Sequence, residues 1–289
     1  MSLSAANPQM STAFDIRWPD GEAESPATPL VFASPHSGQL YPDDMNPALD
    51  PLCIRRTEDA RVDDLVGEGP VLGTPLIRAL TARAYLDVNR DPAELDPRLF
   101  SEALPADART LSPRVAAGLG VVARVASGGA EIYDRRLSLA EGLGRIARVH
   151  QPYHDALSRL LARARRAHGF AVLIDWHSMP ATAAPGVDFV LGDRFGAACS
   201  PALTGAVETM LAEAGYRTAR NSPFAGGYTT EHYGRPQHRT HALQVEINRG
   251  LYLDETRLET TADFERLRGD LGRIIARLVA ADWRNLLAH

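Results

Sequence analysis

Three short apolar runs that end abruptly in polar residues dominate the hydrophobic pattern of this chain. The clearest is Ala171–Ser178, AVLIDWHS, in which Val, Leu and Ile give way to Asp, His and Ser. Its length and its β-branched residues predict a buried parallel strand. Leu30–Pro35 likewise leads into His36, and Ala242–Val245 leads into Glu246. Because open α/β sheets bind ligands at the carboxyl ends of their strands, we expect these polar residues to line a ligand site.

Segments with helical periodicity alternate with these strands. Pro152–His168 carries its apolar residues on one face and is followed by a glycine. Pro201–Ala214 is expected to form a helix capped by Ser200, and Thr261–Leu287 a single amphipathic helix. Strands that alternate with helices predict a three-layer α/β/α fold around a mostly parallel sheet.

The region before the long helix is less regular. Pro75–Leu80 and Ala84–Val88 predict two strands, paired antiparallel around Thr81–Arg83. Thr57 is the expected N-cap of a helix over EDARVDDLV, whose first acids favour the positive end of the helix dipole. Residues 91–130 are rich in Pro, Ala and Gly and predict a long irregular excursion over the site.

The composition fits one α/β domain of ordinary size. Residues 1–27 are expected to form a loose lead-in, and residues 28–289 a single domain. The formal charge of −5 and the absence of a basic block argue against a nucleic-acid partner. No apolar run is long enough to span a membrane, and no signal peptide is recognisable. Cys53 and Cys199 are too few for a disulfide framework or a cysteine zinc site.

His36 and His177 each follow an apolar strand, and Asp175 lies two residues before the second histidine. Neutral imidazoles together with a carboxylate suit Zn²⁺, and Asp175 shares a strand face with His177, so that it can orient the ring. The third ligand stays open at this point. Its candidates are the acids that follow the His36 loop, namely Glu58, Asp59 and Asp63.

Glu246 lies in an otherwise apolar strand, where a carboxylate needs a partner or a raised pKa. It can act as a general base on activated water, or form a structural salt bridge with Arg249 or another arginine. His150 and His154 have the i, i+4 spacing of metal-binding helices, but Pro152 lies between them. We interpret this pair as structural hydrogen-bonding residues at a helix start.

Candidate substrate-binding residues follow other elements. Asn89 and Arg90 come after the second strand of the predicted hairpin and can grip a carboxylate. Arg135 or Arg136 can stabilise an oxyanion. Asn221 and Tyr228 belong to a Gly-rich segment that predicts a flexible lid.

The chain resembles the N-formylglutamate amidohydrolase (N-formylglutamate deformylase) family in short motifs that run in order from about residue 30 to 255. They are SPHSG, EDARVDDL, YLDVNR, RVHQPYH, IDWHS, LGDRFG, NSPFAGGYTTEHYGRP and LQVEINR. The resemblance implies a fold distantly similar to the zinc carboxypeptidases: a phosphorylase/hydrolase-like α/β/α architecture with a mixed, mostly parallel sheet and a hydrolytic zinc.

The resemblance also implies roles for individual residues. His36 and His177 match the first and last zinc ligands, and Glu246 matches the general base. Asn89 and Arg90 match the pair that binds a substrate carboxylate.

The sequence departs from the carboxypeptidase pattern three residues after His36, where Gln39 replaces the expected acid. We therefore select Asp59 as the middle ligand. The resulting expectation is a cytoplasmic zinc-dependent amidohydrolase of histidine catabolism that converts N-formyl-L-glutamate to formate and L-glutamate. Glu246 would act as the base and Arg136 would stabilise the oxyanion.

An acidic side chain on the substrate would need a further arginine, for which Arg136, Arg145 and Arg220 are candidates. The expected partner is a small N-acyl amino acid, and the oligomeric state stays open. The alternatives are a carboxypeptidase-like metallopeptidase and a non-catalytic binding protein for acidic metabolites.

Overall fold

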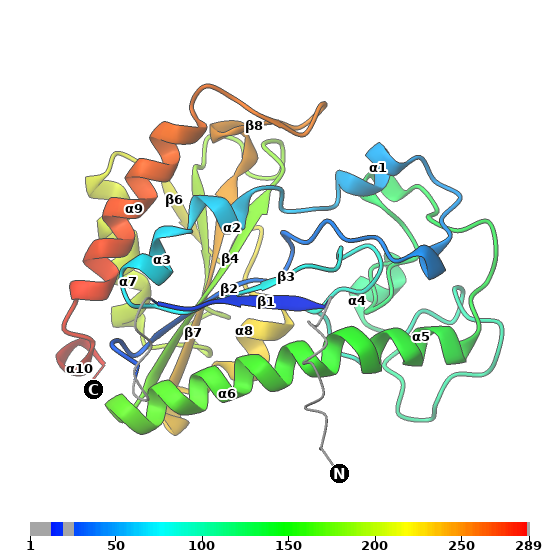
Figure 1. The fold of residues 1–289 in the computed structure, drawn as a ribbon, viewed down its shortest axis with the longest axis horizontal. Helices are drawn as coiled ribbons and strands as arrows, with labels where there is room; N and C mark the ends of the chain where they lie inside the picture. Colours follow the sequence, from blue (N-terminus) through cyan, green and yellow to red (C-terminus); the bar gives the residue numbers. More distant parts are fainter. Residues whose placement is uncertain (1–12, 20–25, 288–289) are drawn as a thin grey trace, which may run out of the picture.

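A seven-stranded mixed sheet forms the centre of the computed structural model, which describes residues 13–19 and 26–287 (Figure 1). The strand order is β1-β3-β2-β4-β7-β5-β6. The strands are β1 (Phe14–Arg17), β2 (Leu30–Ser34), β3 (Leu76–Ala79), β4 (Ala171–Met179), β5 (Phe189–Gly192), β6 (Thr218–Arg220) and β7 (Thr240–Asn248). A separate two-stranded ribbon pairs β8 (Leu253–Asp254) with β9 (Glu259–Thr260).

The middle of the sheet is parallel. β4 pairs in parallel with β2 on one side and with β7 on the other, and β2 pairs in parallel with β3. β1 runs antiparallel to β3, and β5 runs antiparallel to β7. The predicted mixed, mostly parallel sheet is therefore confirmed, and the ends of β2, β4 and β7 that precede the polar residues meet at one edge.

Helices cover both faces of the sheet (Figure 1). The α-helices are α1 (Pro51–Arg55), α2 (Val62–Leu65), α3 (Glu68–Val71), α4 (Pro113–Ala116), α5 (Leu139–Arg145), α6 (Gln151–His168), α7 (Pro201–Glu213), α8 (Tyr228–Tyr233), α9 (Phe264–Ala280) and α10 (Trp283–Leu286). The short helical turns are η1 (Asp43–Met45), η2 (Ser127–Gly129), η4 (Pro236–His238) and η5 (Arg249–Leu251), and η3 (Ile146–His150) is a π-helical segment.

The alternation of side chains along β4 explains the two covering layers. Leu173 packs with α6 residues such as Leu157 in one buried cluster. Ile174 packs in a second buried cluster with α9 residues such as Leu271. Because neighbouring strand residues point to opposite faces, an apolar strand of this kind needs a helix layer on each side. None of the helices in the described ranges has both the length and the apolar composition needed to cross a bilayer.

Two segments differ from the sequence predictions. In both, the burial of the side chains did not reveal whether the backbone is extended. Residues 14–17, assigned above to a loose lead-in, form the edge strand β1. The rest of that lead-in lies largely outside the described residues. Ala84–Val88 is not a strand: Tyr85 and Leu86 donate from their backbone N–H groups to Ala82 in a turn. Its residues are apolar because they are buried, and a short apolar run cannot by itself reveal the backbone conformation.

The helix boundaries also differ in places. The Thr57 hydroxyl donates to the carbonyl of Ile54 instead of capping a new helix, and α2 begins only at Val62. The predicted C-terminal helix divides at Ala281, whose backbone is extended, before Asp282 caps α10.

The long helix likewise continues N-terminal to its predicted start, through η3 into α5. The π-helical η3 ends two residues before Pro152, whose missing N–H and ring disfavour regular α-helical bonding to the preceding turn.

Gly38 allows the His36 loop to approach the neighbouring strand end. A Cβ atom at this position would lie 2.4 Å from the Thr81 carbonyl oxygen and 2.6 Å from that of Leu80. Gly205, in the interior of α7, is the opposite case, because its Cβ would meet only Arg220 Nη2 at 3.9 Å.

We therefore predict that replacing these two glycines by alanine has opposite effects on the free energy of unfolding. We expect Gly38→Ala to lower the free energy of unfolding by about 1–3 kcal/mol, because the new Cβ would force the backbone of Leu80 and Thr81 to move. Gly205→Ala should raise it by about 0.5–1 kcal/mol, because alanine has the higher helix propensity. Urea unfolding of both variants beside the wild type checks this; shifts of the same sign in both would contradict it.

Candidate active site

Three separate segments bring His36, Asp59 and His177 together at the edge of the sheet where the parallel strands end. His36 follows β2, and His177 lies near the end of β4. Asp59 belongs to the turn between α1 and α2, where its backbone N–H donates to the His36 carbonyl at 3.0 Å. All three side chains are buried. The fold therefore positions the three groups next to one another at this edge of the sheet.

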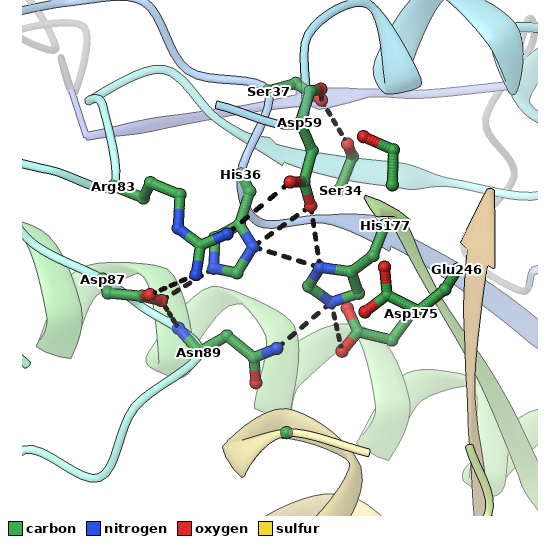
Figure 2. Close-up of polar contacts among 12 residues, drawn as sticks. Ser34, His36, Ser37, Asp59, Arg83, Asp87, Asn89, Asp175, His177 and Glu246 are labelled. Carbon is green, nitrogen blue, oxygen red and sulfur yellow. Dashed lines mark hydrogen bonds and ion pairs between the residues drawn. The ribbon is translucent and has the colours of Figure 1, made fainter. Parts of the chain in front are cut away.

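Their ligand atoms form a small triangle (Figure 2). Asp59 Oδ2 lies 3.2 Å from His36 Nδ1 and 3.0 Å from His177 Nδ1, and the two ring nitrogens are 3.1 Å apart. A single proton can bridge only one pair of these atoms, whereas a cation can bind all three. Ligands of tetrahedral zinc, about 2.0–2.1 Å from the metal, lie roughly 3.4 Å apart, so that a slight expansion of this triangle would accommodate the ion.

Further polar groups orient each imidazole. His36 Nε2 lies 2.7 Å from Asp87 Oδ1, so that a proton on Nε2 leaves the Nδ1 lone pair facing the triangle. His177 Nε2 lies 3.1 Å from both Asp175 Oδ2 and Asn89 Nδ2. Carboxylates behind two metal-binding histidines are the usual means of fixing their tautomers. Asp175 was predicted for this position, and it lies there.

The charges in the cluster favour a bound cation. Burial by itself would lower the pKa of His177, but Asp175 and Asp59 together raise it well above its ordinary value. Burial would raise the pKa of Asp59, but its hydrogen bonds with His177 and His36 lower it well below the usual range. The site therefore stabilises positive charge between these residues.

The geometry separates the three acids that the sequence left open. Only Asp59 contacts both histidines. Glu58 accepts a hydrogen bond from Tyr41 at 2.5 Å, and Asp63 pairs with Arg78 at 2.7 Å. Asp59 is thus the acid whose position matches a ligand role.

Glu246 lies on β7 directly beside His177 in the strand register. It is buried, and its Oε1 accepts a hydrogen bond from Gln244 Nε2 at 2.8 Å. Burial, assisted by the negative charge of Asp59, raises its pKa to about 7, against the opposing effects of His177 and two arginines. A carboxylate with this pKa can both take and return a proton near neutral pH. Arg249 pairs with Asp59 at 2.9 Å, and no salt bridge joins it to Glu246 in the described structure.

These residues open into a cavity of about 650 Å³. Its polar wall includes Asn89 and Arg90, as the sequence predicted, and also Arg83 and Gln244, which the sequence analysis missed. Arg83 lies in a turn with no motif, so that only the folded chain reveals its contact with Asp87 at 2.8 Å.

Several candidate residues do not lie at this cavity. Arg136 donates to the backbone carbonyls of Pro97 and Arg98 on the surface. Arg145 is buried between tyrosine rings, and Arg220 pairs with Glu208. The other displaced candidates are Arg135, which pairs with Glu141, Asn221, which bonds to Asp193, and Tyr228, whose ring stacks on His232. The predicted lid segment nevertheless contributes to the cavity wall through Pro223, Phe224, Ala225, Gly226 and Gly227.

His150 and His154 hold the backbone on either side of Asn89. His150 Nε2 donates to the Arg90 carbonyl at 2.9 Å, and His154 Nε2 donates to the Val88 carbonyl at 2.7 Å. Asn89 in turn accepts from the backbone N–H of Thr229 at 2.8 Å. The pair therefore has the structural hydrogen-bonding role that the sequence suggested, and it fixes a segment of the cavity wall.

Known proteins resemble this chain over most of its length. A family model described as N-formylglutamate amidohydrolase matches residues 28–253. N-formylglutamate deformylase from Pseudomonas aeruginosa is 30% identical over 241 residues, which cover 78% of this chain and 83% of that protein. The crystal structure of N-formylglutamate amidohydrolase from Ralstonia eutropha JMP134 has a TM-score of 0.89 and 36% identity, covering 95% of this chain and 99% of that one. The matched region includes every residue of the His36–Asp59–His177 cluster and Glu246.

The buried histidine pair predicts a pH dependence of stability. Burial, with the neighbouring His150, lowers the pKa of His154 to about 3. An unfolded chain binds a proton at His154 near pH 6.5, but the folded chain does not until about pH 3. The stability that the folded chain gains from a neutral His154 is thus fully present above about pH 6.5, and it is lost as the pH falls toward 3.

We expect the wild type to lose about 2 kcal/mol more than His154→Gln in free energy of unfolding between pH 7.5 and pH 5.0. The glutamine keeps an amide donor for the Val88 carbonyl but does not titrate. Urea unfolding at both pH values measures the difference. An identical pH dependence in the two proteins would contradict the prediction.

Proposed function

Because the chain belongs to the N-formylglutamate amidohydrolase family, we propose that it hydrolyses the amide bond of N-formyl-L-glutamate, giving formate and L-glutamate. The observation that carries the mechanism is the convergence of His36, Asp59 and His177 beside the buried carboxylate of Glu246. Gln39, the departure from the carboxypeptidase pattern, is exposed, and Asp59 provides the acid in its place.

His36 Nδ1, His177 Nδ1 and Asp59 Oδ2 are the atoms that would hold a zinc ion. Two neutral imidazoles and one carboxylate match the donor set of catalytic zinc sites, and the carboxylates of Asp87 and Asp175 would keep the ring nitrogens in the required tautomers. Zinc bound there supplies a Lewis acid that polarises the formyl carbonyl and makes water more acidic.

Glu246 is the proton carrier in this proposal. It takes a proton from the attacking water as the oxygen adds to the formyl carbon. It then gives that proton to the amide nitrogen, so that the C–N bond breaks and the amino group of glutamate leaves. Its pKa of about 7 suits both transfers.

Two further groups position the substrate. Arg83, which is adjacent to Asp59 and Asp87 in the cavity, takes the oxyanion-stabilising role that the sequence had given to Arg136 (Figure 2). Asn89 and Arg90 bind the carboxylate next to the scissile amide. Arg90 lines the cavity, and its Nη2 lies 3.7 Å from Asp87 Oδ2, while its other nitrogens donate to the backbone carbonyls of Asn89 and Leu119.

The ligand assignment predicts different metal contents for two similar variants. Asp59→Asn should weaken zinc binding by more than about 100-fold, because the variant loses a charged ligand. Asp63→Asn, four residues further on, should bind zinc as the wild type does, since Asp63 pairs with Arg78 instead. Mass-spectrometric metal analysis after dialysis checks both proteins. Full zinc occupancy in Asp59→Asn would exclude the ligand role.

The proton-carrier assignment predicts a loss of turnover without a loss of metal. We expect Glu246→Gln to lower kcat/KM for formate release from N-formyl-L-glutamate by at least about 100-fold, because glutamine cannot accept the proton. Zinc content should match that of the wild type. Glu213→Gln, at an exposed carboxylate paired with Arg277, is the matched control. Near-normal turnover in Glu246→Gln would refute the assignment.

A further inference from the structure

The cavity contains more cationic than anionic side chains. Five arginines line it, against the three carboxylates of Asp59, Asp87 and Glu246. The five are Arg56, Arg83, Arg90, Arg114 and Arg249. A low-dielectric cavity with this imbalance favours an anionic ligand even before a metal adds its own charge.

Three of these arginines already have carboxylate or backbone partners. Arg83 pairs with Asp87 at 2.8 Å, and Arg249 pairs with Asp59 at 2.9 Å. Arg90 donates to two backbone carbonyls and lies 3.7 Å from Asp87. The guanidinium groups of these three arginines thus already have hydrogen-bond or ion-pair partners within the protein.

Arg114 differs from these three. Its nearest acid is Glu94, whose Oε2 lies 4.0 Å from Arg114 Nη1, and its guanidinium forms no hydrogen bond with any residue in the described ranges. About a third of its side chain is exposed to solvent. It therefore has donors available for a ligand.

The backbone holds Arg114 at a fixed place beside Arg90. The Ser112 side chain caps α4 by accepting from the Val115 N–H at 3.2 Å, and Arg98 donates to the carbonyls of Val115 and Ala116. Arg90 Nε donates to the Leu119 carbonyl, just beyond α4, at 3.1 Å. Burial lowers the pKa of Arg90, and the positive charges of Arg83 and Arg114 lower it further. The effect of Arg114 is consistent with its position close to Arg90.

We propose that Arg114 binds the side-chain carboxylate of the substrate and so selects an acidic amino acid over a neutral one of the same shape. The inference rests on the proposed function and deepens it. With Asn89 and Arg90 holding the carboxylate next to the amide, the second carboxylate of an N-formyl glutamate meets Arg114, whose guanidinium forms no hydrogen bond in the described residues. Guanidinium groups bind carboxylates through paired donors, a geometry that a neutral amide side chain does not match.

The test compares N-formyl-L-glutamate with N-formyl-L-glutamine, which has the same shape without the charge. We expect Arg114→Gln to lower kcat/KM for the glutamate substrate by about 10- to 100-fold and to leave that for the glutamine substrate nearly unchanged. Arg114→Lys should fall between the wild type and Arg114→Gln. Arg109→Gln is the matched control, because Arg109 belongs to the same excursion but pairs with Asp91 outside the cavity.

Arg56 is the competing cation, since its Nε is buried without a hydrogen-bond partner in the described structure and its Nη2 donates to the Thr256 carbonyl. A selective loss for the glutamate substrate in Arg56→Gln but not in Arg114→Gln would overturn the proposal. Equal losses for both substrates in Arg114→Gln would overturn it as well.

Calorimetric binding of the same two compounds to the zinc-loaded proteins separates this proposal from the proposed function. If the wild type releases formate from neither compound, weaker binding of N-formyl-L-glutamate alone to Arg114→Gln still supports the role of Arg114. Unchanged binding of both compounds, or no binding of either to the wild type, counts against it.

Discussion

The carboxylate of Asp59 is the group on which the site depends. One of its oxygens contacts the ring nitrogens of His36 and His177, and the other lies 2.9 Å from Arg249 and 3.5 Å from Arg83. Without this carboxylate, two guanidiniums and two imidazoles would share a buried region with too little negative charge. Asp59 therefore connects the loop after β2, the end of β4 and the turn after β7.

The fold was predictable where burial and regular geometry coincide. Strand β4 is apolar because it is covered on both faces, and His177 and Ser178 at its end, although buried as well, line the cavity. This reasoning located His36, His177 and Glu246 from the residues alone. It failed for Ala84–Val88, where buried turns have the same composition as a strand, and for β1, whose four half-buried residues give too little pattern.

The site was less predictable than the fold because charged residues meet through tertiary structure. Residue spacing could not choose among Glu58, Asp59 and Asp63, and Asp59 was selected through the family resemblance. Arg136 was a candidate to stabilise the oxyanion, but its guanidinium donates to the carbonyls of Pro97 and Arg98 on the surface. Nothing local distinguishes Arg83 from the other arginines of this chain, which contains no lysine. The groups that each arginine contacts are therefore known only from the structure.

The position of β4 between β2 and β7 has a consequence for synthesis on the ribosome. β7 pairs with β4 over nine residues and is the last strand of the large sheet to be translated. Until Thr240–Asn248 leaves the exit tunnel, one hydrogen-bonding edge of β4, a strand that is buried along its whole length in the folded protein, is open to other chains. A nascent chain that pauses in this interval is thus a template for intermolecular strand pairing, and the completed β7 closes that edge with the strand that also carries Glu246.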